Sequence, residues 1–208
     1  MSKRRGLMIV LSSPSGAGKT TLTRKLLAEH DDMQMSISAT TRKPRTGETP
    51  GKDYNFISTG EFESLLADNA FLEYAKVFDN YYGTPAAPVQ DALDQGKDII
   101  FDIDWQGAQQ LTQAAADDLV KIFILPPSKV ELERRLKSRA QDSDETIAKR
   151  MSKSESEISH WAEYDYVIVN DDLGQSMDLI RAIVAAERAK RKRQLWLGPF
   201  VNNLVQGR

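Results

Sequence analysis

The chain has 208 residues, of which 40% are apolar and 28% charged, a net charge of −2 and no Cys. These values fit one compact globular domain with a small insert, and the near-neutral charge gives no overall sign of nucleic-acid binding. The lack of Cys excludes disulfides, thiol catalysis and Cys-ligated metals. No apolar run is long enough to span a membrane, and the one after Lys3-Arg4-Arg5 is too short for a signal peptide. We therefore expect a cytoplasmic protein without nucleic-acid or membrane partners.

The first predicted element is a buried strand over residues 7–11, which leads into the sequence Ser-Ser-Pro-Ser-Gly-Ala-Gly-Lys-Thr at residues 12–20. Apolar residues at helical spacing follow to about residue 30. The order strand, Gly-containing turn, Lys-Thr and helix predicts a phosphate-binding P-loop, called here the phosphate loop (residues 12–20). The alternative is a Gly-rich turn with an accidental Lys-Thr pair, which the coincidence of all these features disfavours.

The chemistry of the phosphate loop follows from its residue types. Gly16 and Gly18 let the backbone approach the phosphates closely, and the helix that begins near Gly18 adds its positive dipole end. Lys19 supplies a full charge for the outer phosphates of ATP, and the Thr20 hydroxyl can ligate Mg²⁺. Ser13 departs from the usual pattern, which has Gly there. The expected ATP-binding residues of this region are Ser13, Pro14, Ser15, Gly16, Ala17, Gly18, Lys19, Thr20 and Thr21.

The segment over residues 36–57 begins like a strand, is interrupted by Pro and Gly, and then resumes an extended pattern. Arg42 and Arg45 lie close together on it, and two guanidinium groups can form a fork for one phosphate, with Tyr54 adding a hydroxyl. From charge alone, a solvated basic loop is the more frequent explanation. A helix over 61–69, a strand over 71–77, a turn over 80–84 and a helix over 85–94 are predicted next.

A second buried strand, over residues 98–104, ends in acidic residues, and Asp102 is where a P-loop enzyme places a carboxylate near its metal. The alternative is an ordinary strand end with acidic caps. The patterns then predict a helix over 105–116, a strand over 120–125, a helix from the N-cap Ser128 to about 139, and a helix over 145–161. A strand over 166–169 and a helix over 177–193 follow, whereas the tail over 194–208 gives no clear prediction. Trp105 and His160 are expected to have packing or structural roles.

The stretch over residues 134–150 is rich in Arg and Lys and could form a mobile lid over a nucleotide, although such a run is more often a solvated helix face. Together with the phosphate loop, the two arginines and the Asp-ended strand, it indicates a kinase that acts on a phosphorylated small molecule.

Over about residues 7–190 the chain resembles the guanylate kinase family. The most specific motif is Thr-Arg-Lys-Pro-Arg-Thr-Gly-Glu at 41–48 with Gly51, Tyr54 and Phe56, and residues 80–84, 102–107 and 169–172 match as well. One departure is that Arg139 lies between Ser138 and Ala140, where family members often have Gly on both sides.

The resemblance implies a three-layer α/β P-loop NTPase fold with a central parallel sheet. It divides the chain into a P-loop core (1–34 and 89–208), a small mixed α/β GMP-binding insert (35–88) and a helical lid at about 138–155. The implied activity is ATP-dependent, Mg²⁺-assisted, in-line phosphorylation of GMP, and of dGMP, to the diphosphate in purine nucleotide metabolism and GMP recycling. The oligomeric state stays open.

The resemblance also implies residue roles. The residues implied for GMP are Ser38, Arg42, Arg45, Tyr54, Glu73, Tyr82, Thr84, Asp102 and Asp104. Arg135 and Asn170 are implied near the adenine of ATP. The residues implied for catalysis are Lys19, Arg42, Asp102, Arg139 and Arg150. Mg²⁺ would be held by Thr20, with Asp102 acting through a water molecule.

Two other functions compete with this interpretation. The first is a related P-loop kinase of another phosphorylated metabolite, against which the guanine-reading set Ser38, Glu73 and Asp104 argues. The second is a non-catalytic guanylate-kinase-like interaction module, against which the Gly16, Gly18, Lys19 and Thr20 pattern argues.

Overall fold

The structure is a computed structural model that describes residues 4–77, 79–138 and 144–207. Its centre is a five-stranded sheet in which every neighbouring pair is parallel, in the order β2-β7-β1-β8-β9. The strands are β1 (Met8–Ser12), β2 (Met33–Met35), β7 (Asp98–Phe101), β8 (Leu119–Leu125) and β9 (Tyr166–Val169). The expected α/β fold with a central parallel sheet is confirmed.

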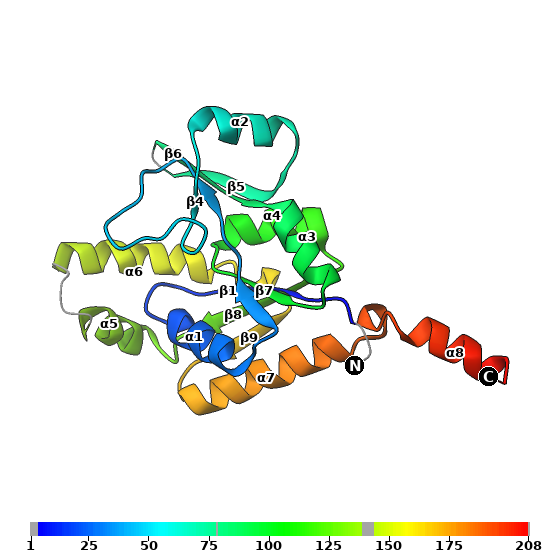
Figure 1. Ribbon diagram of the computed structural model, residues 1–208. Coiled ribbons are helices and arrows are strands. Elements are labelled where there is room, and N and C mark those ends of the chain that lie inside the picture. The colour runs from blue at the N-terminus through cyan, green and yellow to red at the C-terminus, as the bar shows by residue number, and fades with distance from the viewer. Residues whose placement is uncertain (1–3, 78, 139–143, 208) are drawn as a thin grey trace.

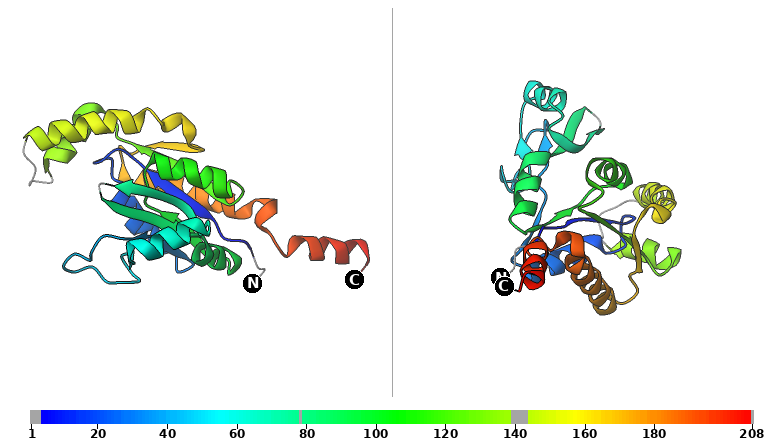
Figure 2. Two further views of the ribbon diagram at one scale, coloured as in Figure 1. Left: turned by 90° about the horizontal axis from the view of Figure 1, so that it is seen from above. Right: turned by 90° about the vertical axis from the view of Figure 1, so that its right-hand side faces the viewer.

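Two apolar clusters cover the two faces of this sheet, because consecutive residues of a strand point to opposite sides. On one face, Ile9 of β1 packs in a cluster with buried residues of α1 (Lys19–Glu29) and α7 (Leu173–Ala189). On the other, Val10 packs in a cluster with α3 (Ala86–Asp94) and α4 (Trp105–Ala115). Figures 1 and 2 show the resulting three layers.

A smaller mixed sheet, in the order β4-β3-β6-β5, lies beside the central one. Its strands are β3 (Ala39–Thr40), β4 (Asn55–Phe56), β5 (Phe71–Val77) and β6 (Asn80–Pro85), and α2 (Thr59–Ala67) packs on it. The prediction of a turn over 80–84 was wrong, because these residues form β6, which pairs with both β5 and β3. Strand pairing on two sides has overridden the local turn signal of Asn and Gly.

Other elements differ at their ends. Strand β2 was not predicted, because only three residues take part, and β7 ends at Phe101, before the acidic residues. Helix α7 begins at Leu173, four residues earlier than expected, because the Asp172 side chain caps it by accepting from the Gln175 amide. The remaining helices are α5 (Lys129–Ser138), α6 (Asp144–Ile158) and α8 (Leu197–Val205), with short 3₁₀ turns at Trp161–Glu163 and Arg191–Arg193.

Helix α8, in the tail that gave no clear prediction, projects from the body as an exposed arm without buried residues. Before the arm, the end of α7 is tied to the beginning of the chain. Buried Asp98 accepts from Arg4 at 2.6 Å and from Arg188 at 2.7 Å, and the Arg5 amide donates to the Arg193 carbonyl at 2.8 Å. This polar cluster lies at the amino ends of the central strands.

Candidate active site

The phosphate loop leaves the carboxyl end of β1 and enters α1 directly. Gly16 and Gly18 have φ of 97° and 105°, the left-handed region that favours glycine. A Cβ on Gly18 would lie 2.3 Å from the Asn170 side-chain nitrogen. Gly18 is also the N-cap of α1, so the loop brings its amides to the positive end of that helix, as an anion site requires.

Asn170, the residue after β9, is hydrogen-bonded to the phosphate loop through its side chain. Its Nδ2 donates to the Ala17 carbonyl at 2.7 Å, and its Oδ1 accepts from the Ser176 hydroxyl at 3.0 Å. Arg135 of α5 donates to the Asn170 carbonyl at 3.1 Å. The side-chain amide of Asn170 therefore braces the loop. Asn170 and Arg135 also line an open pocket with Gly16, Gly18 and Thr21.

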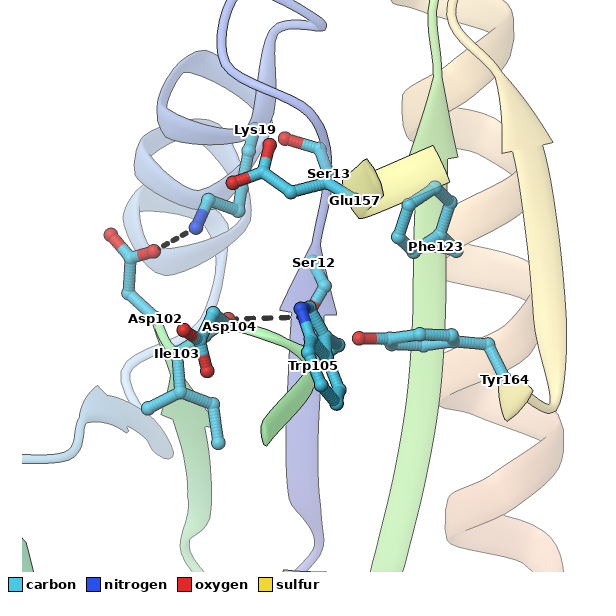
Figure 3. Close-up of a pocket in the computed structure, with 10 residues that line it drawn as sticks. All are labelled: Ser12, Ser13, Lys19, Asp102, Ile103, Asp104, Trp105, Phe123, Glu157 and Tyr164. Atoms are coloured by element: carbon cyan, nitrogen blue, oxygen red, sulfur yellow. Dashed lines mark hydrogen bonds and ion pairs between the residues drawn. The ribbon is translucent and has the colours of Figure 1, made fainter. Parts of the chain in front are cut away.

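Lys19 forms an ion pair with Asp102, which follows β7, the neighbour of β1 in the sheet. The two residues line a cavity of about 260 Å³ over the phosphate loop, which also contains Thr20 and Glu157. They also line an adjoining cavity of about 140 Å³ with Asp104, Trp105 and Tyr164 (Figure 3). Strand order thus explains why two segments more than 80 residues apart meet at one site.

The donors near the phosphate loop fit a magnesium ion. The Thr20 hydroxyl and the Asp102 carboxylate line the same cavity, and Mg²⁺ typically takes one or two protein oxygens and completes its shell with water and phosphate. Within the described residues no cluster of three or more His, Cys, Asp or Glu could hold a metal by itself. A metal ion bound at this site would therefore need ligands from water or phosphate in addition to the protein oxygens.

Arg42, in the loop between β3 and β4, is fixed by Glu48. Its guanidinium donates to both carboxylate oxygens, at 3.0 and 2.8 Å, and lies over the Tyr54 ring with its carbon 5.4 Å from the ring centroid. The pKa of Glu48 is lowered, first by the hydrogen bond from Arg42 and then by the Arg45 amide. Arg45 is exposed on the same loop, and Tyr54 and Tyr82 meet edge to face at 6.0 Å. The structure therefore brings Arg42, Tyr54 and Tyr82 together.

Glu73, on β5, is buried and directly opposite Thr84 on β6. The Thr84 hydroxyl donates to Glu73 at 2.6 Å and lies 3.2 Å from the Ser38 hydroxyl. Burial raises the pKa of Glu73, and the nearby Asp104 charge raises it further. Three side chains that sequence reasoning grouped together thus form one hydrogen-bonded chain.

Asp104 is the N-cap of α4 and accepts from the amides of Gln106 and Gly107 at 3.0 and 3.2 Å. Gly107 lies between Asp104 and Glu73, since a Cβ on Gly107 would be 3.4 Å from Glu73 Oε2, so Asp104 connects the buried Glu73 of the smaller sheet with the cavity that Lys19 lines. Of the expected lid residues, Arg150 lies on α6, whereas Arg139 lies outside the described residues.

Sequence reasoning missed several residues at the site. Glu157 of α6 lines both cavities and accepts from the Ser15 amide at 3.3 Å. Trp105, expected to pack, lines the smaller cavity and stacks on His160 with centroids 3.7 Å apart. Tyr164 is buried, and its hydroxyl, which faces this cavity, makes no hydrogen bond of normal geometry; burial raises its pKa to about 12. No local motif marks these residues, although the Arg42–Glu48 pair could have been found from opposite charges on one short loop.

Comparisons with known proteins agree on one family. A family model described as Guanylate kinase matches residues 5–187. The chain is 60% identical over 201 residues to a guanylate kinase of Rhodospirillum rubrum, covering 97% of this chain and 92% of that protein. It is 57% identical over 204 residues to one of Paramagnetospirillum magneticum, covering 98% and 95%. The crystal structure of guanylate kinase from Anaplasma phagocytophilum is similar, with a TM-score of 0.74, 40% identity and coverage of 97% and 96%.

Proposed function

The chain belongs to the guanylate kinase family of ATP-dependent nucleoside monophosphate kinases, and from this premise we propose that it transfers the γ-phosphoryl group of ATP directly to the phosphate of GMP. An oxygen of the GMP phosphate attacks the γ-phosphorus in line, the bond to the β-phosphate oxygen breaks, and the products are GDP and ADP. No side-chain nucleophile is needed. The attacking oxygen is already anionic, so no strong general base is needed either.

One observation carries the proposal: Lys19 of the phosphate loop and Asp102 share a cavity with Asp104, and Gly107 connects Asp104 to the buried Glu73, because its amide donates to Asp104 and a Cβ on it would lie 3.4 Å from Glu73 Oε2. A donor region made of backbone amides and an acceptor region made of hydrogen-bonding side chains therefore meet at the edge where β1 and β7 end. This is the arrangement that a transfer between two bound nucleotides requires.

On the acceptor side, we assign the GMP phosphate to Arg42, Arg45, Tyr54 and Tyr82, because cations and hydroxyls gather there. Arg42 is held by Glu48 in one orientation, so little side-chain entropy is lost when a phosphate binds. We assign guanine to Ser38, Glu73, Thr84 and Asp104. A carboxylate can accept from both N1–H and the 2-amino group of guanine, whereas adenine lacks these donors.

On the donor side, the backbone of Ser13 to Thr21, through its unpaired amides, and the Lys19 ammonium bind the phosphates of ATP, and Arg135 and Asn170 flank the adenine. Lys19, with Arg139 and Arg150 of the proposed lid, stabilises the negative charge that spreads over the transferring group. Closure of the lid and of the proposed GMP-binding insert (35–88) excludes water from the site. Mg²⁺ held by Thr20, and by Asp102 through water, would supply charge neutralisation of the phosphates.

The finer parts of the proposal concern substrate range and setting. We include dGMP, because the residues assigned above contact the base and the phosphate and none is assigned to the ribose 2′-hydroxyl. A role in purine nucleotide metabolism and GMP recycling follows from the product. The cytoplasmic location expected from the sequence stays a prediction. Within the described residues, no helix has both the length and the apolar character to cross a bilayer.

The test is a phosphorylation assay with ATP over GMP, dGMP, AMP, CMP, UMP and ribose phosphates, with and without Mg²⁺. We expect GMP to be the preferred acceptor and turnover to require Mg²⁺. Preference for a ribose phosphate would favour a related metabolite kinase, and failure to bind ATP would favour a non-catalytic module.

A further inference from the structure

Glu157 is the acidic side chain that α6 directs at the phosphate loop. It lies near the carboxyl end of α6, its side chain is 17% exposed, and its carboxylate accepts from the Ser15 amide at 3.3 Å. It lines both cavities that contain Lys19 and Asp102. A carboxylate therefore lies against a loop amide of the kind that binds an anion.

The contact follows from the electrostatics of the loop. Ser15 lies in the loop three residues before the N-cap Gly18, and turns with successive backbone N–H groups form anion-binding concavities. A hydrogen bond from an amide to a carboxylate is also charge-assisted. The compensating cation of Glu157 is weakly placed, because the ammonium of Lys153, one turn earlier on α6, lies 3.7 Å away and is mostly exposed. The phosphate loop is thus the better-ordered partner of this carboxylate.

A phosphate and this carboxylate cannot share the loop. Both are anions, the carboxylate already accepts from the Ser15 amide, and the cavity of about 260 Å³ over the loop has the carboxylate as part of its wall. A phosphate bound to the Ser15 amide would lie next to the Glu157 carboxylate, and repulsion between adjacent like charges is strong where water is partly excluded. Binding of phosphates at the loop must therefore displace Glu157 or its helix.

We propose that Glu157 is an intramolecular competitor of ATP that lowers the affinity of the phosphate loop for phosphates and couples phosphate binding to movement of α6. The same helix carries Arg150, two turns before Glu157 and on the same face, as the spacing of seven residues requires. Movement of α6 thus exchanges an anion for a cation at the phosphates. The proposal rests on the assignment of ATP to this loop.

The experiment measures dissociation constants by calorimetry for the full chain and two variants. Glu157→Gln removes the charge and keeps the shape, so the fold is preserved. Glu155→Gln is the matched control, because it makes the same charge change on the same helix in an exposed side chain that pairs with Lys129. The probes are ATP, ADP and inorganic pyrophosphate, each with EDTA and with Mg²⁺, and GMP as an acceptor control.

In EDTA we expect Glu157→Gln to bind ATP, ADP and pyrophosphate about three- to tenfold more tightly than the wild type. This corresponds to a carboxylate that blocks the loop for roughly 70–90% of the time. Glu155→Gln and the affinity for GMP should not change. In turnover, KM for ATP should fall in Glu157→Gln by more than kcat changes.

Unchanged or weaker binding of ATP by Glu157→Gln in EDTA overturns the proposal. So does a loss of affinity confined to Mg²⁺-containing buffer, since that would make Glu157 part of the metal shell. In either case, ATP binding and GMP phosphorylation by the wild type would leave the proposed function standing. Failure of the wild type to bind ATP or to phosphorylate GMP would instead contradict the proposed function.

Discussion

At the scale of single residues, the prediction for Lys19 concerns the charge of the ligand and not the packing of the core. Its ammonium is paired with Asp102 in the cavity over the phosphate loop. Lys19→Ala should lower kcat/KM for ATP by about 10²–10³-fold, the size of effect that loss of a preorganised charge has elsewhere. Circular dichroism and thermal unfolding should stay near the wild type. Lys25→Ala, on the exposed side of α1, is the control, and near-normal turnover of Lys19→Ala would contradict the mechanism.

Acceptor choice is a second prediction at this scale. Glu73→Gln keeps the size of the side chain and can still accept from Thr84, but it presents an amide NH₂ group, itself a donor, to one of the two donors of guanine. Sites built on substrate hydrogen bonds reject analogues that lack them by about 10⁴-fold or more. We therefore expect a large fall in kcat/KM for GMP and a smaller ratio of GMP to AMP, with ATP binding unchanged. An unchanged ratio would move guanine recognition to Ser38 and Asp104.

The same variant should reveal a stability cost of the site. Because burial raises the pKa of Glu73 above its usual 4.5, the folded protein holds this proton more tightly than the unfolded chain does. The stabilising contribution is complete below pH 4.5 and is lost as pH rises through the folded pKa. Glu73→Gln should thus unfold at a higher temperature than the wild type at pH 8, and the gap should close toward pH 4. Glu63→Gln, an exposed change in α2, should show no such trend.

Residue identities could be predicted where chemistry is local, and not where it depends on distant partners. Gly16, Gly18, Lys19 and Thr20 lie in one short motif, so the donor loop was recognisable directly. Glu157 lies more than 140 residues after Ser15, and nothing in its own neighbourhood marks it. Only the packing of α6 against the loop brings the two together.

At the scale of elements, the phosphate loop combines a left-handed backbone with a bracing side chain. Gly18→Ala should strain the backbone at φ 105° and bring the new methyl group against Asn170. We expect about 1–3 kcal/mol of lost stability and weaker ATP binding. Gly60→Ala in α2 is the control, since a Cβ there meets nothing within 4 Å and should stabilise by about 0.5–1 kcal/mol. Equal effects of the two changes in chemical denaturation and calorimetry would contradict the bracing.

The predicted elements differ in how far local pattern decides them. Strand β9 has the predicted bounds, and helix α3 begins at Ala86, one residue after the predicted start, with Val89, Ala92 and Leu93 recurring on its buried face. Strand β6 was read as a turn, since Asn80 and Gly83 favour turns locally. Its extended form comes from pairing with β3, about 40 residues earlier, which no local window contains.

At the scale of the whole molecule, the α8 arm and the polar cluster at the chain ends should contribute very different amounts to the free energy of unfolding. Arg193 is 1% exposed and donates to the Gly6 carbonyl at 3.3 Å, beside Asp118 and Glu187. Arg193→Ala should lower the free energy of unfolding by about 3 kcal/mol, since acidic groups lose a buried partner. Deletion of residues 197–208 should change it by less than about 0.5 kcal/mol and leave the kinase rate unaltered. Urea unfolding of both variants is the measurement, and a large loss on deletion would mean that the arm packs on something.

The brace between Asn170 and the phosphate loop also has a consequence for biosynthesis. Ala17 leaves the ribosome early, yet Asn170, whose side chain donates to the Ala17 carbonyl, follows 153 residues later. At about 5–20 residues per second, the nascent chain carries the loop for roughly 8–30 s before its brace is made. The central strand β1 also remains unpaired for part of synthesis, because its partners β7 and β8 lie about 90 and 110 residues downstream. The phosphate loop is thus translated early, but its hydrogen bond to Asn170 forms only late in synthesis. An incomplete chain that stops before β9 lacks the brace that holds the loop in shape.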